Sequence, residues 1–216
     1  MRAVAACLLD VYETVLSCDF GDHATQLPAL AGVPVEVWNR QFLQLGPAVT
    51  DGTLSMADAY AQVIRAAGKT PTADVVAGLV QRDHELLVQG SRVHDDRIPF
   101  LEMLRRRGIA TAFVSNCAEN TRLLLDELGL SGLVDVLILS CEVGWAKPSP
   151  EIYQNALGAL GVSAQAAVLV DDQRLYCDGA SLLGITAIQI CRGNVGSVGH
   201  EGATVACSLW ELEGLF

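Results

Sequence analysis

Five apolar runs separated by helical patterns constrain this chain more than any other feature of its sequence. The runs cover residues 3–9, 109–115, 134–139, 167–170 and 185–190. Continuous apolar runs of this length are typical of parallel strands that are buried on both faces. Strands that alternate with helices imply right-handed crossovers. The sequence therefore predicts an α/β fold with a Rossmann-like, doubly wound parallel sheet.

A different pattern fills the stretch between the first and the second run. Helical spacing of apolar residues begins at Pro34, at Ser55 and at Thr72, and no strand-like run separates these segments. Ser and Thr are favoured N-caps, and Pro is tolerated in the first turn of a helix. We therefore predict an α-helical cap domain inserted into the core. The cap comprises residues 19–90, and the core domain comprises residues 1–18 and 91–216.

Composition excludes several classes of protein. Hydrophobic residues make up 51% of the 216 residues and charged residues 18%, as in a folded globular chain. A formal net charge of −11 repels nucleic acids and anionic membranes. The run over residues 3–9 is too short for a membrane span or a signal sequence. We expect a cytoplasmic protein, a monomer or a homodimer, that binds a small anionic molecule and neither nucleic acid nor membrane.

The cysteines and histidines show no sign of a disulfide framework or a zinc site. Seven cysteines are scattered without a C-x-x-C pair, so we expect reduced and mostly buried thiols. His23, His84, His94 and His200 have no spacing typical of metal ligands. Surface or loop positions are therefore the prediction for these histidines.

Polar side chains follow several of the apolar runs where the predicted strands end. They are Asp10 after the first run, Ser115 and Asn116 after the second, and Asp171 and Asp172 after the fourth, with Lys147 in the loop before the fourth. Each of them alone would be an ordinary capping or loop residue. Ligands of open parallel sheets bind at the carboxyl ends of the strands, so these residues together predict a site there.

The order and spacing of these segments resemble the haloacid dehalogenase superfamily, which contains many phosphatases as well as dehalogenases. The resemblance covers nearly the whole chain, and one large branch of the family has a helical cap between its first two motifs. The matching segments are Asp10 to Thr14 for the D-x-D-x-T motif, Ser115-Asn116 for the second, Lys147 in KPSPEIY for the third, and VLVDD with Gly179-Ala180 for the fourth.

The resemblance implies covalent catalysis by a hydrolase. Asp10 would be the nucleophile and would form an intermediate that water then hydrolyses. Thr14 and Ser115 would donate hydrogen bonds to the group under attack, and Asn116 would help through its side chain or its backbone. Lys147 would neutralise negative charge around Asp10 and the substrate.

A magnesium ion is also implied, because the family's phosphatases bind Mg²⁺ at the first and fourth motifs. The ligands would be Asp10, the backbone carbonyl of Tyr12, and a carboxylate of Asp171 or Asp172. Adjacent carboxylates suit Mg²⁺ better than a softer metal.

Tyr12 departs from the phosphatase pattern. It stands where those enzymes carry a second Asp, the general acid that protonates the leaving oxygen. The reference pKa of a phenol is about 10, against about 4 for Asp, and loss of general acid–base help costs about 10² to 10⁴ in rate. Tyrosine at this position resembles the 2-haloacid dehalogenases, whose halide leaving group needs no proton and whose site binds no metal.

Other residues give mixed indications. Asp171 and Asp172 stand where those dehalogenases have small polar residues, and without a cation two more anions would repel Asp10. Glu13 replaces a usual Gly and is a candidate for the missing carboxylate or for a substrate contact. Arg40 falls near the dehalogenases' substrate-binding Arg, which would make it, with Tyr12, a substrate-binding residue.

Three functions therefore remain open. A Mg²⁺-dependent phosphatase of a small phosphorylated metabolite is favoured, because Asp171 and Asp172 have a role only beside a cation. A metal-free dehalogenase-like hydrolase is the alternative. A catalytically weak binding or regulatory protein is the third, and the presence of Asp10, Lys147 and Asp171 together counts against it.

Overall fold

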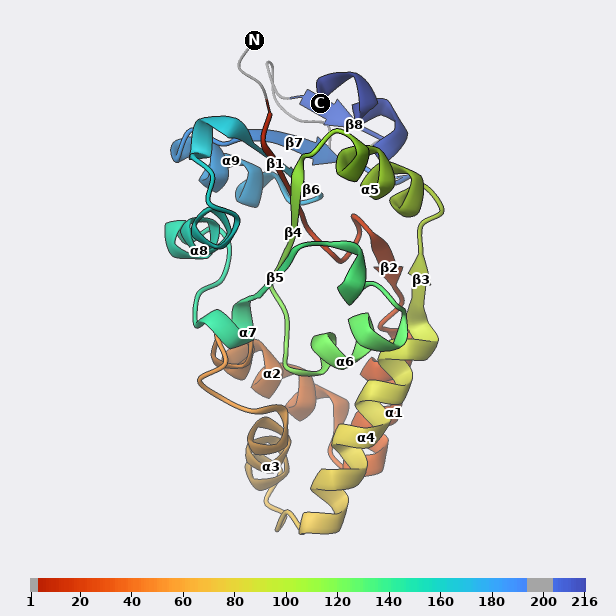
Figure 1. The fold of residues 1–216 in the computed structure, drawn as a ribbon. Coiled ribbons are helices and arrows are strands. Elements are labelled where there is room, and N and C mark those ends of the chain that lie inside the picture. Colours follow the sequence, from red (N-terminus) through yellow and green to blue (C-terminus); the bar gives the residue numbers. More distant parts are fainter. Residues whose placement is uncertain (1–3, 194–203) are drawn as a thin grey trace.

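The computed structural model describes residues 4–193 and 204–216, and its core contains a fully parallel sheet (Figure 1). Within the described residues the sheet has six strands in the order β5-β4-β1-β6-β7-β8. They are β1 (Ala6–Leu9), β4 (Ala110–Ser115), β5 (Val136–Leu139), β6 (Ala167–Asp171), β7 (Thr186–Ile190) and β8 (Thr204–Ala206). The chain winds from β1 through β4 to β5 on one side and from β6 to β8 on the other. The predicted doubly wound fold is confirmed, and the five apolar runs form β1 and β4 to β7.

Alternate residues of the central strands pack against the helices on opposite faces of the sheet. Cys7 and Leu9 belong to an apolar cluster with α5 (Arg97–Arg106) and α6 (Asn120–Glu127). Ala6 and Leu8 belong to a second cluster with α8 (Pro150–Leu160) and α9 (Arg174–Leu182). Both faces of β1 are therefore fully buried, which is why its sequence is a continuous apolar run instead of an alternating one.

Four helices occupy the chain between β2 (Leu16–Cys18) and β3 (Ser91–Val93), which pair as an antiparallel ribbon. The helices are α1 (Gly21–Ala31), α2 (Val35–Thr50), α3 (Met56–Ala66) and α4 (Ala73–Gly90). Ser55 and Thr72 cap α3 and α4 by accepting the N–H of Asp58 and Val75. The four helices share an apolar cluster of their own, separate from the two clusters of the sheet. Neither α1 nor the ribbon is predicted by the sequence pattern.

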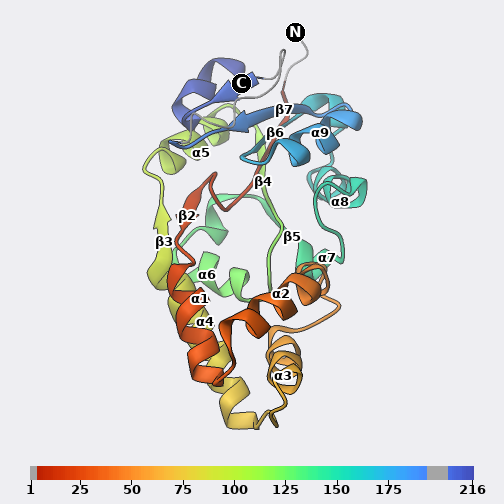
Figure 2. The ribbon, with the colours of Figure 1, turned by 180° about the vertical axis from the view of Figure 1, so that it is seen from behind.

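The helical cap lies against the edge of the sheet where β1, β4 and β5 end, as the view from behind also shows (Figure 2). Ser140 at the start of α7 (Ser140–Val143) donates through Oγ to the carbonyl of Thr50, at 2.7 Å. Gly52 has φ +75°, and a Cβ there would lie 1.9 Å from the carbonyl oxygen of Cys141. The cap therefore touches the core backbone so closely that a side chain larger than hydrogen does not fit at Gly52.

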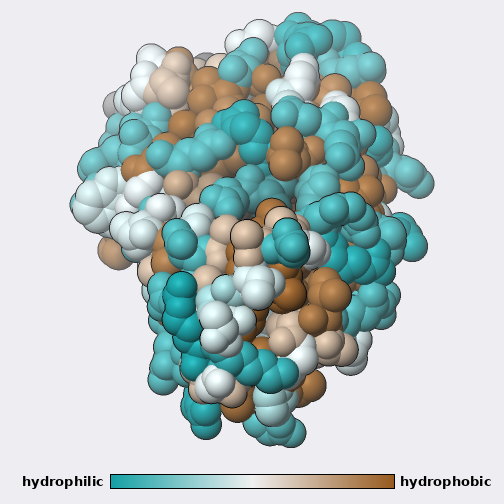
Figure 3. Space-filling model, turned by 90° about the horizontal axis from the view of Figure 1, so that it is seen from below, coloured by the Kyte–Doolittle hydropathy of each residue, from teal (hydrophilic) through white to brown (hydrophobic). Residues whose placement is uncertain are grey.

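The remaining elements are three short 3₁₀ helices, η1 (Ser131–Leu133), η2 (Ala164–Ala166) and η3 (Leu209–Leu215). Seen from the cap end, the surface mixes hydrophilic with apolar side chains, and the exposed apolar residues of the cap include Leu30 and Leu43 (Figure 3). Among the described helices, none combines the length and the apolar character that a bilayer crossing requires. Among the cysteines, Cys7, Cys117 and Cys177 are buried and the other four are partly or fully exposed, so fewer are buried than expected. His200 lies outside the described residues.

Candidate active site

The carboxyl ends of three neighbouring strands bring the predicted acidic residues together. Asp10 directly follows β1, Ser115 is the last residue of β4, and Asp171 is the last residue of β6. Because β1 pairs in parallel with both β4 and β6, the three strand ends lie side by side. This edge is where the winding of the sheet reverses, which is the usual place for a ligand in such folds.

Lys147 lies between two of these carboxylates. Its Nζ donates to Oδ1 of Asp10 and to Oδ2 of Asp171, both at 2.6 Å, and its side chain is fully buried. The ring of Tyr176 adds a cation–π contact, with its centroid 5.1 Å from Nζ. A buried ammonium so placed holds the two carboxylates at a defined separation.

Burial governs the protonation of these groups. It raises the pKa of Asp10 to about 7, although the positive charge of Lys147 opposes the shift. Burial, with the negative charge of Asp171, raises the pKa of Asp172 to about 6. Burial alone would lower the pKa of Lys147, but the attraction of Asp10 and Asp171 outweighs it and raises that pKa. Lys147 is therefore a permanent cation, and the site has more negative than positive charge.

Asn116 and Gly179 position the loop that carries Lys147. The side-chain amide of Asn116 donates to the carbonyl of Lys147 at 2.8 Å and accepts its backbone N–H at 2.7 Å. The following bond to Pro148 is cis. A Cβ on Gly179 would lie 2.7 Å from the Cβ of Pro148, so α9 approaches this loop through a glycine. The side-chain amide of Asn116 is thus tied to the backbone of Lys147, and its second N–H and its backbone N–H are the donors that the predicted role could use.

Gly179→Ala tests this close approach. The added methyl group would push Pro148 and Lys147 away from α9, and we expect the rate of catalysis at this site to fall at least about tenfold, with a loss of about 1–3 kcal/mol in the free energy of unfolding. Gly158→Ala on α8 is the matched control, because no atom lies within 4 Å of its added Cβ. Initial rates and urea unfolding of both variants measure the effect, and equal rates for the two would contradict it.

Two buried hydroxyl groups at the site lack partners. Thr14 Oγ1 and Ser115 Oγ are fully buried, and neither has a hydrogen-bond partner among the described residues. Buried hydroxyls are ordinarily paired, and an unpaired one costs about 1–3 kcal/mol. These two are therefore suited to pair with a bound group that supplies acceptors.

The acidic cluster has the donor set of a magnesium site. Asp10, Asp171 and Asp172 each offer a carboxylate oxygen, and these oxygens lie within 4.8 Å of one another. Opposite ligands of an octahedral Mg²⁺ are about 4 Å apart, so a small contraction would suffice. Three carboxylates against one lysine leave a formal charge of −2 when all are ionised, which a divalent cation would balance. The residues present therefore fit the ion.

The side chain of Tyr12 does not take the place of a general acid. Its hydroxyl is hydrogen-bonded to Oγ1 of Thr121 on α6, at 2.9 Å. Burial raises the pKa of Tyr12 further above its ordinary value. Tyr12 therefore belongs to the wall of the adjoining cavity, and its phenol is committed to Thr121.

Glu13 and Arg40 are both exposed, and Glu13 borders a surface hollow that Asp172 also lines. Glu13 has φ 56°, the left-handed conformation that suits the glycine usual in the family, and its Oε1 accepts the backbone N–H of Cys18 at 3.1 Å. This contact ties the loop after β1 to the end of β2. Arg40 is exposed on α2 and does not line the cavity, so the structure does not bring it together with Asp10.

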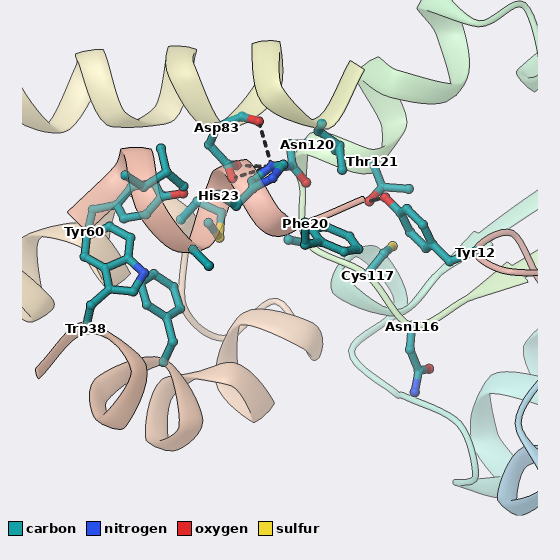
Figure 4. Close-up of a pocket in the computed structure, with 16 residues that line it drawn as sticks. Tyr12, Phe20, His23, Trp38, Tyr60, Asp83, Asn116, Cys117, Asn120 and Thr121 are labelled. Carbon is teal, nitrogen blue, oxygen red and sulfur yellow. Dashed lines mark hydrogen bonds and ion pairs between the residues drawn. The ribbon is translucent and has the colours of Figure 1, made fainter. Parts of the chain in front are cut away.

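A cavity of about 540 Å³ lies between the cap and the core, next to Tyr12 and Asn116 (Figure 4). Tyr12, Asn116 and Thr121 line its core side, and Trp38, Phe42 and Tyr60 line its cap side. The sequence patterns do not predict the polar members of its wall, His23, Asp83 and Asn120, because they come from three separate helices. The volume is within the range of small-molecule sites.

The capped parallel sheet and the carboxylate cluster at its edge define a capped α/β protein with a strand-end site. The chain belongs to the haloacid dehalogenase-like hydrolase family, whose sequence profile matches residues 4–174. The predicted membership of this hydrolase superfamily is thereby confirmed.

Among curated proteins the chain is similar to several phosphatases. It is 36% identical to a phosphatase of Mycobacterium tuberculosis over 116 residues, which cover 53% of this chain and 52% of the relative. It is 33% identical to a glyceraldehyde 3-phosphate phosphatase of Methanopyrus kandleri over 134 residues, 61% of this chain and 57% of the relative. The chain thus spans about half the length of the curated relatives it matches.

Solved structures resemble the whole chain. A phosphatase of the same family from Thermococcus onnurineus superimposes with a TM-score of 0.73 at 26% identity, covering 98% of this chain and 97% of that one. An L-2-haloacid dehalogenase from Xanthobacter autotrophicus superimposes with a TM-score of 0.66 at 18% identity, covering 98% of each. The second likeness concerns the fold alone.

Proposed function

We propose that this protein is a Mg²⁺-dependent phosphatase that uses Asp10 as its covalent nucleophile on a small phosphorylated organic molecule. One observation carries the proposal. Asp10 and Asp171 both pair with the buried cation of Lys147, Asp172 lies beside them, and two buried hydroxyls at the same strand ends have no partner among the described residues. The curated relatives named as phosphatases support the same activity.

The chain's own residues suit two successive displacements at phosphorus. The Nζ of Lys147 donates a hydrogen bond to Oδ1 of Asp10. The other oxygen, Oδ2, would therefore form the bond to phosphorus while the ester oxygen departs. Thr14 and Ser115 would donate to the phosphoryl oxygens. Water would then attack the same phosphorus, release inorganic phosphate and restore the carboxylate of Asp10.

Asp10, Asp171 and Asp172 would hold the magnesium ion, with the backbone carbonyl of Tyr12 as a further ligand expected from the family resemblance. When bound, Mg²⁺ supplies positive charge that neutralises the phosphate and the excess of carboxylates. Lys147, whose pKa is raised by its two partners, keeps its own charge through the reaction.

The missing general acid restricts the substrates to esters with good leaving groups. The Tyr12 hydroxyl is held by Thr121, and the Glu13 carboxylate is held by the N–H of Cys18. Both groups already have hydrogen-bond partners, so we assign neither of them as the acid that protonates a departing oxygen. A phenolate can leave without a proton more readily than an alkoxide, so aryl phosphates are the substrates of choice for a first assay.

The position of Tyr12 also favours the second candidate, a dehalogenase, because a departing halide needs no proton. A 2-haloacid, however, carries a carboxylate that needs a cation. The described residues that line the cavity include neither Lys nor Arg, and Lys147 already pairs with two carboxylates. These contacts favour the phosphatase.

A paired assay tests the proposal. Phosphate release from 4-nitrophenyl phosphate and halide release from 2-chloropropionate are each measured with Mg²⁺ and with chelator. We expect phosphate release that falls at least about 10²-fold on chelation, and no halide release. Halide release that is insensitive to chelator would replace the phosphatase with the dehalogenase. Activity in neither assay, with no heat of Mg²⁺ binding by calorimetry, would contradict both and leave the binding protein.

A further inference from the structure

The cap cavity contains a polar cluster that the proposed reaction does not use. Asp83 on α4 is only 6% exposed, and its Oδ2 accepts a hydrogen bond from the amide of Asn120 at 2.5 Å. The Nε2 of His23 on α1 lies 3.6 Å from Oδ1 of Asp83 and 3.2 Å from its backbone carbonyl. Figure 4 shows these three side chains meeting across the cavity from Asn116.

This cluster has unused capacity to accept hydrogen bonds. A carboxylate offers about four acceptor positions, and Asn120 and His23 fill only part of them for Asp83. The Tyr60 hydroxyl is fully buried and makes no hydrogen bond of ordinary geometry with a described residue; burial, with the nearby carboxylate of Asp83, raises its pKa. The buried Nδ1 of His23 also lacks a partner among the described residues. Unpaired buried groups of this kind indicate a place for a ligand with donors.

The rest of the wall is mostly apolar, and its cap side is aromatic. Trp38 lies 5.0 Å from Phe42 and 5.6 Å from Tyr60, measured between ring centroids. Phe20 extends this surface toward Tyr12, with ring centroids 6.3 Å apart. None of the described lining residues is Lys or Arg. A flat apolar group is therefore suited to this cavity, whereas a second anionic group has no fixed cation to pair with.

We propose that the cavity selects substrates in which an aryl-sized apolar body connects the phosphate to a distal primary amine, which Asp83 binds with Tyr60 as a second acceptor. This proposal rests on the proposed function, which places the phosphate group of the substrate at Asp10. It adds the chemical class of the rest of the substrate.

Charge and geometry both favour an ammonium group at this place. An ammonium has three donors and no acceptor, which matches the carboxylate of Asp83, the hydroxyl of Tyr60 and Nδ1 of His23. Burial raises the pKa of Asp83, so its ionised form is poorly solvated without a ligand. A cation nearby would stabilise that form, and aromatic rings around it would add cation–π attraction. A distal carboxylate would instead be repelled.

Three phosphates with matched leaving groups test the selection. They are 4-(2-aminoethyl)phenyl phosphate, 4-propylphenyl phosphate and 4-(2-carboxyethyl)phenyl phosphate, all esters of para-alkyl phenols. Because the phenolate is nearly the same in each, differences in kcat/KM report on the distal group. We expect the amine to exceed the propyl compound by at least about tenfold and the carboxylate to be the poorest. Phosphate release from all three without preference for the amine would overturn the proposal while the phosphatase stands.

Variants assign the preference to Asp83 and Tyr60. Asp83→Asn keeps the size of the side chain and an acceptor for Asn120, and it should bring the ratio of amine to propyl kcat/KM close to one. Tyr60→Phe should reduce that ratio severalfold. Asp74→Asn, at an exposed position in the first turn of α4, is the matched control and should keep the wild-type ratio. An unchanged ratio in Asp83→Asn, with a wild-type circular dichroism spectrum, would overturn the proposal.

A binding measurement keeps this test separate from that of the phosphatase. Calorimetry with 4-(2-aminoethyl)phenol and 4-propylphenol needs neither turnover nor metal and is done in chelator. Tighter binding of the amine that is lost in Asp83→Asn supports the amine site, whether or not phosphate is released. Absence of phosphate release would contradict only the phosphatase. Equal binding of the two phenols would contradict the amine site.

Discussion

Replacing Asp10 by Asn should lower phosphate release by about 10⁴-fold or more, as the loss of a covalent nucleophile typically does. An amide oxygen is a poor nucleophile, and the proposal assigns Asp171 and Asp172 to the metal ion, not to attack on phosphorus. The fold should persist, because Asn has the same shape and Lys147 keeps Asp171 as a partner at 2.6 Å. Single-turnover assays with a trapped phosphoenzyme measure the effect directly.

Asp178→Asn is the control for this substitution. Asp178 lies on α9 near the site, but it is exposed, and its ion pair among the described residues is with Arg174, at 3.6 Å. Its replacement should leave the rate within about twofold, since exposed ion pairs contribute little. A folded Asp10→Asn protein that releases phosphate at the wild-type rate would refute covalent catalysis at this residue, whatever the control shows.

Replacing Lys147 by Met should cost about 3–5 kcal/mol in the free energy of unfolding, measured in chelator at neutral pH. The substitution keeps the length of the side chain but leaves Asp10 and Asp171 buried without their cation. Phosphate release should fall at least about 10²-fold, because a positive charge next to the transferred group is lost. Urea unfolding with and without Mg²⁺ provides the measurement.

Magnesium should stabilise Lys147→Met more than it stabilises the wild type, because the ion then replaces a missing charge as well as binding its ligands. The matched control is Lys69→Met, which removes the chain's other lysine. Lys69 is exposed and donates to the carbonyl of Gly32, so its loss should cost less than about 1 kcal/mol. If both variants unfold at the wild-type urea concentration in chelator, the buried ion pairs do not have the role assigned to them.

The core was predictable because its elements are encoded locally. Each buried parallel strand needs apolar residues on both faces, so the run over residues 3–9 identifies β1 without knowledge of its neighbours. The ribbon of β2 and β3 has no such signature, because each strand has three residues and the partners are more than 70 positions apart. The helix α1 also escapes prediction, since Pro28 interrupts its pattern and Phe20 provides no side-chain cap.

For the candidate site, residue types were predictable but orientations were not. The convergence of Asp10, Lys147 and Asp171 follows from strand order, which the alternation of strands and helices implies. The direction of the Tyr12 side chain depends on Thr121, which is 109 positions away. The amide of Asn116 is committed to the backbone of Lys147, and Arg40 is exposed on α2. No local pattern indicates any of these contacts.

The amino-acid sequence by itself determined the parallel sheet, the presence of a helical insertion, and the acidic residues and lysine that end at one edge of the sheet. These follow from apolar periodicity and from residues at strand ends, which are properties of short segments. Only the tertiary structure decided which side chains remain without partners and which surround the cavity. Such properties depend on contacts between distant segments, as the meeting of His23, Asp83 and Asn120 demonstrates, because hydrogen bonds and burial are satisfied in space and not along the chain.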